Sequence, residues 1–408
     1  MSELFLFDDA VARTFEPFAL TRPISELRAG ALLLRERWER AFQRRAAGSI
    51  AAPHLADFDE PGAARPLGTR LTVPAGSILA NSRCAVSLLP QKLGDAKVWH
   101  CDGRVAAIAL SREVSIDELR AGRFTLESLA TAGSGPHDIA GQWIDHVWDF
   151  IGKLAPMLVE DLSRLSDGMK PVKVDGSGGK KSPVFAEPDA HIESQTYFDT
   201  SGGPVYVARG AKVQTFTRIV GPCYIGADSQ VLGEKIAASS IGDVCKLHGE
   251  ANSIVMLGHS NKGHEGFVGH SYFGRWVNLG AGTITSNLKN TYSSVELWTP
   301  NGTADTDLQF LGTMFGDHAK TGIGTPLNTG TVVGAGANVF GGTLPPKAVP
   351  PFAWGDRPPY DSYDIDKFFE VARRAMARRH VELSPGVERT LRRAYELRWS
   401  VDEPTETR

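Results

Sequence analysis

Residues 248–287 of this 408-residue chain gather side chains suited to proton transfer. Four of the chain's eleven histidines lie there: His248, His259, His264 and His270. Glu250 and Lys262 stand among them. A neutral imidazole can take a proton from an amine, a carboxylate can fix its tautomer, and a lysine can hold a phosphate. The pattern predicts amide formation, in which the deprotonated amine attacks a thioester.

Other polar residues follow the histidine cluster. Asn278 and Asn287 offer amide dipoles for a sugar hydroxyl or an acetamido carbonyl. His318 and Lys320 are two apart and would share one side of an extended strand, where they could bind the phosphates of coenzyme A or the sugar. Each histidine alone can equally be a coil residue whose hydrogen bonds are satisfied internally, so the cluster as a whole indicates the site.

A six-residue period must position these groups. Aliphatic residues recur without a break at five positions: Val207, Val213, Ile219, Ile225 and Val231. The register returns at Phe273, Leu279, Leu327, Val333 and Val339. A straight segment and a corner every six residues close a three-sided coil with one aliphatic side chain per face. The period predicts a left-handed parallel β-helix of hexapeptide repeats over residues 184–357.

The period breaks twice, at residues 234–267 and 285–311, where polar and charged residues enter. We expect loops that leave the coils there, since loops on a rigid scaffold carry binding residues.

The regions before and after the predicted β-helix have other sequence patterns. Residues 1–172 mix apolar strands (4–7 and 106–110) with helical runs (27–45 and 143–165), which predicts an α/β domain. Residues 173–183 are rich in glycine and lysine and read as a linker. Residues 358–408 carry arginine and glutamate on a helical period, which predicts a C-terminal helical extension.

Composition narrows the function. The formal net charge of −3 provides no basic field for nucleic acid. The four cysteines are widely spaced and indicate neither a disulfide framework nor a zinc knuckle. The N-terminal residues do not resemble a signal peptide, and no apolar run reaches the ~18 residues of a membrane span, so a cytoplasmic location is expected.

The second half of the chain resembles a known family. The segments that carry the resemblance are NKGHEGF (261–267), NLGAGT (278–283), SNLKN (286–290), GDHAK (316–320) and NTGTVVG (328–334). They are similar to the acetyltransferase domain of the GlmU-like bifunctional sugar nucleotidyltransferase / glucosamine-1-phosphate N-acetyltransferases, and most similar to a divergent branch of that family. The resemblance implies a left-handed β-helix that forms a homotrimer, with acetyl-CoA bound between subunits.

The resemblance also implies roles for single residues. His264 falls on the family's catalytic base and Glu250 on its acidic partner, while Asn278 and Asn287 fall on substrate-binding asparagines. Backbone N–H groups of the glycine-rich corner would steady the oxyanion near the acetyl-CoA thioester. That corner comprises Gly280, Ala281, Gly282 and Thr283.

The sequence departs from the family at two positions. The family's substrate lysine is Asn252 here, and an aromatic residue three after the base is Phe267 in place of tyrosine. Two explanations stay open: phosphate binding passes to Lys262, Lys289 or Lys320, or the substrate differs from that of the family.

The N-terminal region resembles the same branch in FDD (7–9), FEPF (15–18), LTRP (20–23) and VWD (147–149). The glycine-rich loop of standard nucleotidyltransferases does not follow the first strand. Nucleotide phosphates would then be bound by Arg13, Arg22 and Arg28, and Mg²⁺ would be bound by Asp8, Asp9 or Asp102. Alternatively, Arg22 and Arg28 form ion pairs at a helix start.

These observations predict an acetyl-CoA-dependent N-acetyltransferase acting on an amino-sugar phosphate, coupled to nucleotidyl transfer from UTP or dTTP. One alternative is a metal-dependent β-helix enzyme of the γ-carbonic-anhydrase kind, with His259 and His264 as two ligands of an intersubunit zinc site. Another is a non-catalytic trimer that binds a sugar nucleotide.

Overall fold

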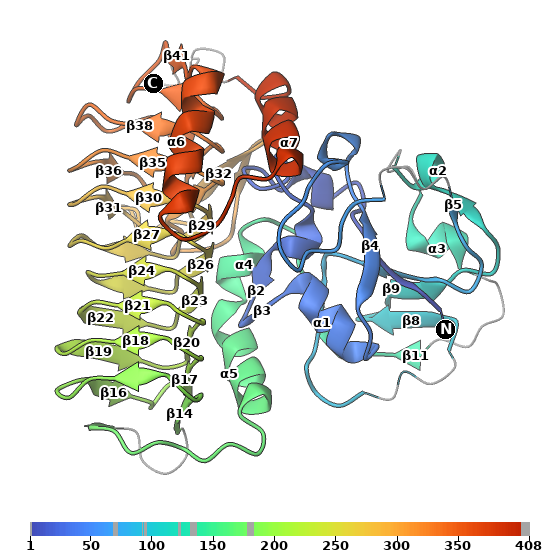
Figure 1. Ribbon diagram of the computed structural model, residues 1–408, viewed down its shortest axis with the longest axis horizontal. Coiled ribbons are helices and arrows are strands. Elements are labelled where there is room, and N and C mark those ends of the chain that lie inside the picture. Colours follow the sequence, from blue (N-terminus) through green and yellow to red (C-terminus); the bar gives the residue numbers. More distant parts are fainter. Residues whose placement is uncertain are drawn as a thin grey trace. The chain divides into compact units, whose positions relative to one another are not determined.

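A computed structural model describes residues 2–67, 72–91, 93, 96–120, 124–130, 137–177 and 183–400 (Figure 1). The chain divides into two compact units. The first comprises Met1–Val147 and Ser384–Glu396, and the second comprises Trp148–Leu383 and Leu397–Arg408. Within the described residues, no helix is long and apolar enough to cross a membrane.

The first unit is built on a mixed sheet with strand order β11-β8-β9-β6-β1-β4. Its strands are β1 (Leu4–Phe7), β4 (Ala46–Ile50), β6 (Ile78–Asn81), β8 (Val98–Cys101), β9 (Arg104–Ala109) and β11 (His137–Asp138). Strand β1 pairs in parallel with both β4 and β6. Leu4 and Leu6 enter one hydrophobic cluster while Phe5 and Phe7 enter another, so β1 is buried on both faces. The α/β domain predicted here is confirmed.

Smaller elements surround this sheet. They are the pairs β2 (Arg28–Ala29) with β3 (Leu32–Leu33), β5 (Thr72–Val73) with β10 (Val114–Ser115), and β7 (Cys84–Val86) with β12 (Gly141–Trp143), and the helices α1 (Leu34–Ala41), α2 (Ile116–Arg120), α3 (Leu126–Leu129) and α7 (Pro385–Glu396).

Two predicted helices begin later than expected. The run 27–45 opens with the β2–β3 hairpin, because Gly30 adopts a φ of 64° and turns the chain before α1 starts at Leu34. The run 143–165 forms α4 (Asp149–Gly152) and α5 (Leu154–Leu165) only. Trp143 ends strand β12, where its indole N–H donates to the Cys101 carbonyl at 2.9 Å. Its helical spacing to later apolar residues is therefore coincidental.

The second unit contains the predicted β-helix, a parallel solenoid with three faces. The first face carries β13 (Gly176–Ser177), β16 (Tyr197–Asp199), β19 (Thr217–Val220), β22 (Glu234–Ala237), β25 (Ala251–Asn252) and β28 (Val268–Gly269). The second face carries β14 (Val184–Ala186), β17 (Val205–Val207), β20 (Cys223–Ile225), β23 (Ser240–Asp243), β26 (Val255–Gly258), β29 (Tyr272–Arg275), β34 (Thr313–Phe315), β37 (Thr331–Val333) and β39 (Ala348–Val349). The third face carries β15 (His191–Ile192), β18 (Lys212–Val213), β21 (Gln230–Val231), β24 (Lys246–Leu247), β27 (Asn261–Lys262), β30 (Asn278–Leu279), β35 (Lys320–Thr321), β38 (Asn338–Val339), β40 (Ala353–Trp354) and the antiparallel β41 (Asp361–Ser362).

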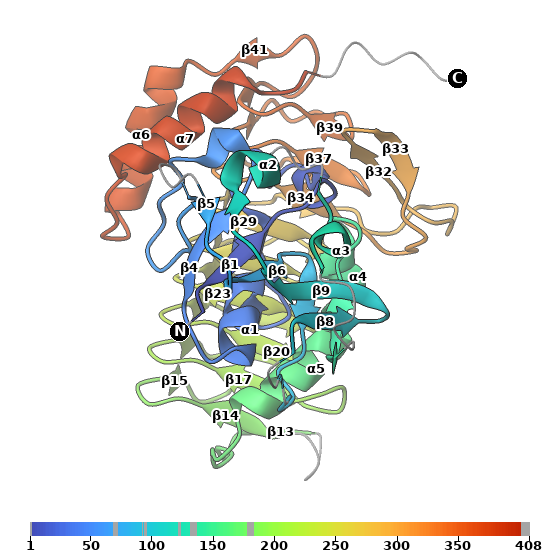
Figure 2. The same cartoon turned by 90° about the vertical axis from the view of Figure 1, so that its right-hand side faces the viewer.

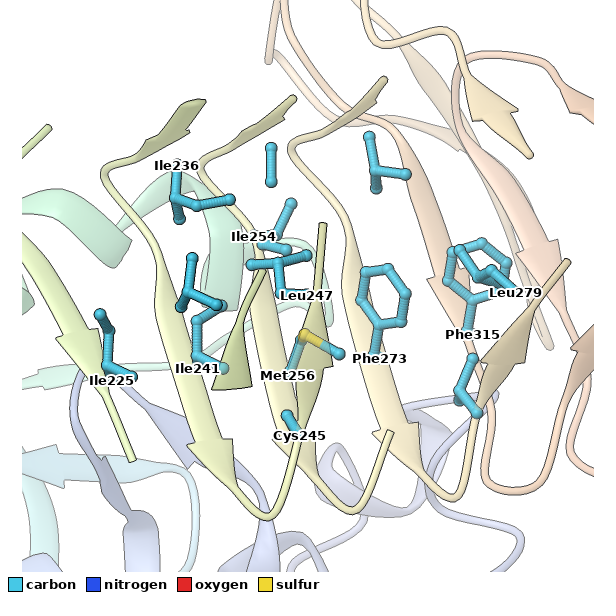
Figure 3. Close-up of a cluster of buried hydrophobic side chains, with 14 of the residues drawn as sticks. Ile225, Ile236, Ile241, Cys245, Leu247, Ile254, Met256, Phe273, Leu279 and Phe315 are labelled. Carbon is cyan, nitrogen blue, oxygen red and sulfur yellow. The ribbon is translucent and has the colours of Figure 1, made fainter. Parts of the chain in front are cut away.

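The six-residue period is the period of this solenoid. Val207 pairs with Ile225, eighteen residues later, so three hexads complete one coil. These side chains are fully buried and stack with their neighbours into one continuous core (Figure 3). The same core includes the later positions Val333 and Val339, as the returning register predicts.

The two breaks in the period have different structures. Across 234–267 the coils continue, but Ile241 pairs with Met256 only fifteen residues later. The prediction of loops leaving the solenoid there is wrong, because shortened corners alone disturb the period. Across 285–311 the chain does leave the coils and forms the hairpin of β32 (Glu296–Thr299) and β33 (Gly302–Asp305), which projects from the solenoid (Figure 2). Beside it, β31 (Ile284–Thr285) pairs with β36 (Pro326–Leu327).

Helices complete the second unit. In addition to α4 and α5, this unit contains helix α6 (Ile365–Ala377), which runs along the coils that carry β27 to β38 (Figure 1). Asp364 caps its N-terminus by accepting hydrogen bonds from the backbone N–H groups of Asp366 and Lys367. Together α6 and α7 confirm the predicted helices between 358 and 400. Of the predicted linker, Gly176–Ser177 form β13, while residues 178–182 lie outside the described part of the chain.

Candidate active site

A column of polar residues runs along the outside of the third face. Lys246 pairs with Asn261, Asn261 with Asn278, and Asn278 with Lys320 on successive coils. The Asn261 side-chain amide donates to the Asn278 side-chain oxygen at 3.0 Å. Strand alternation explains the column, since the residue that follows each outward one points into the core. Parallel stacking thus brings residues as far apart in sequence as Lys246 and Lys320 into one column.

A pocket of about 520 Å³ lies against this column. Residues of the solenoid form one wall, and residues of α6 and the turn after it form the other. The lining residues are Leu232, Lys246, His259, Asn261, Gly263, His264, Trp276, Val277, Asn278, Lys320, Val371, Arg374, Ala375, Arg378 and Arg379. The structure therefore brings three predicted site residues, His264, Asn278 and Lys320, to one pocket.

His264 lies on the corner between β27 and β28, with its side chain exposed at the pocket. Its backbone carbonyl accepts a hydrogen bond from the Lys262 ammonium, and the carbonyl of the next residue, Glu265, accepts one from the Gly282 N–H at 3.2 Å. The corner is thus fixed from two coils while the imidazole stays accessible.

Lys262 occupies an interior position of the solenoid. It pairs in register with the core residue Leu247, and only 2% of its surface is exposed. Its ammonium also donates to the carbonyl of His248 at 2.8 Å. Burial lowers the pKa of Lys262 to about 8. Its hydrogen bonds therefore hold two corners, and this geometry does not present it to a substrate phosphate.

Lys320 is the predicted phosphate lysine that reaches the pocket. Its ammonium donates to the carbonyl of His318 at 3.0 Å. Burial lowers the pKa of Lys320 to about 8, since desolvation disfavours the charged form.

His318 lies on a column of aromatic corner residues. His259, Trp276 and His318 all adopt φ near 60° at corners between the second and third faces. The rings of His259 and Trp276 are 4.4 Å apart and those of Trp276 and His318 are 6.2 Å apart, while Phe368 of α6 packs edge-on against His318. The prediction that His318 and Lys320 share one side of a strand is wrong, because His318 precedes β35 in a left-handed corner.

Glu250 is exposed and lies before β25 of the first face. Its carboxylate pairs with the ammonium of Lys235 at 3.3 Å. Within the described residues, no hydrogen bond joins Glu250 to His264 in one chain. An orienting role for Glu250 stays a prediction.

Asn287 lies at a different corner from the His264 pocket. Its amide donates to Nδ1 of His270 at 2.8 Å, and the His270 ring stacks on Phe310 at 5.3 Å. Burial lowers the pKa of His270 to about 4, so the ring is neutral and can accept this hydrogen bond. Lys289 lines another pocket, of about 320 Å³, together with Lys347. Within one chain, the predicted substrate-binding residues therefore lie at several different corners of the solenoid.

The glycine-rich corner uses most of its backbone donors internally. The N–H of Gly280 donates to the Thr321 carbonyl at 3.1 Å, and that of Thr283 to the Gly280 carbonyl at 3.1 Å. The N–H of Gly282 also donates to a carbonyl. Within the described residues of one chain, the N–H of Ala281 is therefore the one backbone donor of this corner left for an oxyanion.

The first unit has a pocket of its own at the carboxyl end of β1. The chain passes from β1 to β4 on one side and later to β6 on the other, and ligands bind at such switch points in α/β sheets. The pocket measures about 260 Å³, and its polar lining includes Asp9, Asn81, Arg83 and Arg104.

Ion pairs organise this pocket. Arg83 binds Asp9 at 2.7 Å and Asp145 at 2.8 Å, and Arg104 binds Asp145 at 2.8 Å. Burial alone would raise the pKa of Asp9, but the hydrogen bonds and charge of Arg83 outweigh burial and lower it. The Arg104 guanidinium also lies 3.9 Å from the ring centre of Trp143. Of this set, sequence reasoning found only Asp9, because the others lie far apart in sequence and outside any recognised motif.

The predicted nucleotide-binding arginines lie elsewhere, in internal contacts. Arg22 is buried and binds both carboxylate oxygens of Glu60, at 2.8 and 3.2 Å. Arg28 is also buried and donates to the Ala31 carbonyl, and Arg13 donates to the carbonyl of Arg120. The alternative of an ion pair fits Arg22, which is held too deeply to reach a nucleotide.

The carboxylates predicted to hold Mg²⁺ do not form a metal site. Asp8 is buried and accepts from the Ile24 N–H at 3.0 Å, and burial raises its pKa to about 6. Asp9 is engaged by Arg83, and Asp102 is exposed in the β8–β9 turn. No group of three His, Cys, Asp or Glu side chains that could hold a metal occurs anywhere in the described ranges.

Comparison with known proteins finds similarity to one protein family and to several bifunctional proteins. Residues 4–170 match the family model for sugar nucleotidyl transferases. The chain is 30% identical over 167 residues to a bifunctional sugar-1-phosphate nucleotidylyltransferase/acetyltransferase of Sulfurisphaera tokodaii. That alignment covers 40% of this chain and 37% of the relative. It is a distant homologue of such bifunctional proteins. It therefore combines a sugar nucleotidyltransferase domain with an acyltransferase-like β-solenoid.

Another distant relative is the bifunctional protein GlmU of Acaryochloris marina, 25% identical over 188 residues that cover 44% of this chain and 38% of GlmU. The chain thus spans less than two fifths of the length of these curated relatives. Among solved structures, it aligns with AntD, an N-acyltransferase from Bacillus cereus solved with dTDP-4-amino-4,6-dideoxyglucose and coenzyme A. That alignment covers 54% of this chain and 96% of AntD, with 13% identity and a TM-score of 0.22.

Proposed function

We propose that the solenoid transfers the acetyl group of acetyl-CoA to the amine of an amino-sugar phosphate, such as glucosamine 1-phosphate. The observation that carries this proposal is the third-face pocket, where His264, Asn278 and Lys320 converge from separate coils. An exposed imidazole on a fixed corner, an amide on a neighbouring strand and a lysine provide a base, a sugar ligand and a cation.

The chemistry follows from these groups. The imidazole of His264 takes a proton from the substrate amine, whose nitrogen then attacks the thioester carbonyl carbon. The C–N bond forms, the C–S bond breaks, and the leaving thiolate of coenzyme A takes up the further proton that the nitrogen loses as it becomes an amide. Asn278, on the adjacent strand, would bind a hydroxyl and orient the sugar.

The first unit would transfer a nucleotidyl group from UTP or dTTP to the acetylated sugar phosphate. The match of residues 4–170 to sugar nucleotidyl transferases and the pocket at the carboxyl end of β1 support this part. The carboxylates present do not fit the Mg²⁺ that the family implies, so we assign no step to a metal.

We further propose that the protein acts in the cytoplasm, as part of nucleotide-sugar synthesis for the cell envelope, and as a homotrimer. The distribution of predicted substrate residues supports a trimer, because the Asn287 corner and the His264 pocket of one chain do not meet.

An acceptor panel tests the acyl-transfer proposal. Release of free thiol from acetyl-CoA would be followed with glucosamine 1-phosphate, other amino-sugar phosphates, and glucosamine without phosphate. We expect saturable thiol release with at least one amino-sugar phosphate and an N-acetylated product by mass spectrometry. If no acceptor raises thiol release above the rate without protein, the proposal is wrong.

A further inference from the structure

The pocket beside His264 is strongly basic. Five cationic side chains line it: Lys246, Lys320, Arg374, Arg378 and Arg379. The described lining residues include no carboxylate. The lysines belong to the third face, and the arginines belong to α6 and the turn that follows it. Cations from two separate elements therefore converge on one cavity.

The pocket exists because α6 changes character along its length. Its first half packs on the solenoid through Phe368, which contacts the rings of His318 and Phe352. Further along, Arg374 and Arg378 are four apart and share one helix face, which faces the pocket. This face leaves a cavity between the helix and the coils, and guanidinium groups form part of its lining.

Helix stability explains only part of this arrangement. Basic residues in a last turn interact favourably with the helix dipole, and Arg374 pairs with Glu370 at 3.2 Å in an exposed contact of small energy. Neither effect accounts for Lys246 and Lys320, which face the same cavity from the solenoid. Like charges around one cavity repel each other, and an anion bound between them would relieve that repulsion.

The chemistry indicates the class of anion. Guanidinium groups bind phosphate through paired hydrogen bonds, and a lysine adds a point charge. Lys262 is held inside the solenoid by the carbonyls of His248 and His264 and does not line the pocket. The site proposed for acyl transfer therefore needs another source of phosphate recognition, and α6 supplies it directly beside His264.

We infer that Arg374 of α6 and Arg378 at its C-terminal cap, together with Lys320, form the phosphate-binding wall of the His264 pocket. The inference deepens the proposed acyl transfer and rests on it. The ligand chemistry is a phosphate monoester or diphosphate, which both the acceptor sugar phosphate and coenzyme A carry. The C-terminal helix thereby becomes part of the substrate site.

Binding of inorganic pyrophosphate to the full chain tests this wall without turnover. Isothermal titration would compare the wild type, the double variant Arg374→Gln/Arg378→Gln, and Arg373→Gln as a control. Arg373 is also exposed on α6, but it lies over Phe369 and outside the pocket lining. We expect affinity to fall at least about tenfold in the double variant and to change less than about twofold in the control. Equal affinities for all three proteins, each with an unchanged melting temperature, would overturn the inference.

Kinetics then identify the source of the phosphate. A rise in KM for the sugar phosphate alone assigns the wall to the acceptor, and a rise in KM for acetyl-CoA alone assigns it to the donor. Unchanged values of both would overturn the inference and leave acyl transfer intact. If no acceptor supports turnover, loss of pyrophosphate binding in the double variant still supports the anion site, and the failure belongs to the proposed function.

Discussion

At the scale of single residues, Lys262 shows how a buried charge can serve a neighbouring group. Its ammonium holds the carbonyls of His248 and His264 from inside the solenoid. We expect Lys262→Met to change the free energy of unfolding by less than about 1–2 kcal/mol, because removal of a buried charge offsets the loss of two hydrogen bonds. The kcat for acyl transfer should nevertheless fall about 10- to 100-fold, as the His264 corner loses its anchor.

Leu247→Met, one coil earlier at the matching interior position, is the control for Lys262→Met. Thermal unfolding and steady-state kinetics of both variants would separate a positioning role from a structural one. Full kcat in Lys262→Met would show that the corner does not depend on this lysine.

His270 makes stability depend on pH. Its pKa is lowered from 6.5 to about 4 by burial, so between these values the unfolded chain binds a proton that the folded chain excludes. The contribution is thus present above pH 6.5 and is lost as pH falls toward 4. We expect His270→Gln to flatten the decline of melting temperature over this range, whereas the exposed His380→Gln should not. Parallel slopes for His270→Gln and wild type would contradict this assignment.

At the scale of the elements, the backbones of neighbouring coils lie so close together that some positions of the solenoid have no room for a side chain. A Cβ added at Gly242 would lie 2.4 Å from the Leu257 carbonyl oxygen and 2.5 Å from that of Met256. Because both atoms belong to the backbone of the next coil, they cannot move aside locally. We expect Gly242→Ala to destabilise the protein by about 2–3 kcal/mol in urea unfolding.

Gly152→Ala in α4 serves as the comparison, since its added Cβ would meet the movable Leu308 side chain at 3.3 Å. It should be neutral or stabilising, because alanine favours helix. Equal losses in both variants would mean that coil spacing is not the cause.

Some of these elements could be predicted from the sequence and others could not. The period from Val207 to Val231 predicts the solenoid because each coil repeats one simple packing rule. It fails at 234–267, since a corner shortened by two or three residues shifts the aliphatic positions without ending the coils. Helix positions near Trp143 fail for another reason, because strand pairing with β7 overrides helical spacing.

Site residues are harder to predict than the fold. His264, Asn278 and Lys320 line one pocket, whereas Lys262 and Asn287 lie in other surroundings. Whether a residue points inward or outward depends on coil length, which an aligned motif does not reveal. The arginines of α6 could not be found from solenoid motifs, because they reach the pocket from a separate element. Their spacing of four was the one available signal.

At the scale of the whole molecule, we expect a homotrimer. A homotrimer would have three times the chain mass of 44.0 kDa in light scattering after size-exclusion chromatography. Contact with a second subunit would give the exposed His264 corner a neighbour and could supply the groups that one chain keeps at other corners. A mass that stays at one chain across micromolar concentrations would contradict the trimer.

At the same scale, the proposed function depends on His264 acting as the base for acyl transfer in the third-face pocket. The most direct measurement is kcat for thiol release with the best acceptor, in His264→Gln and in His191→Gln, an exposed histidine on the same face at β15. We expect a loss of at least about 100-fold in His264→Gln. His191→Gln should keep the wild-type rate. A full rate in His264→Gln, with folding intact, would contradict the claim.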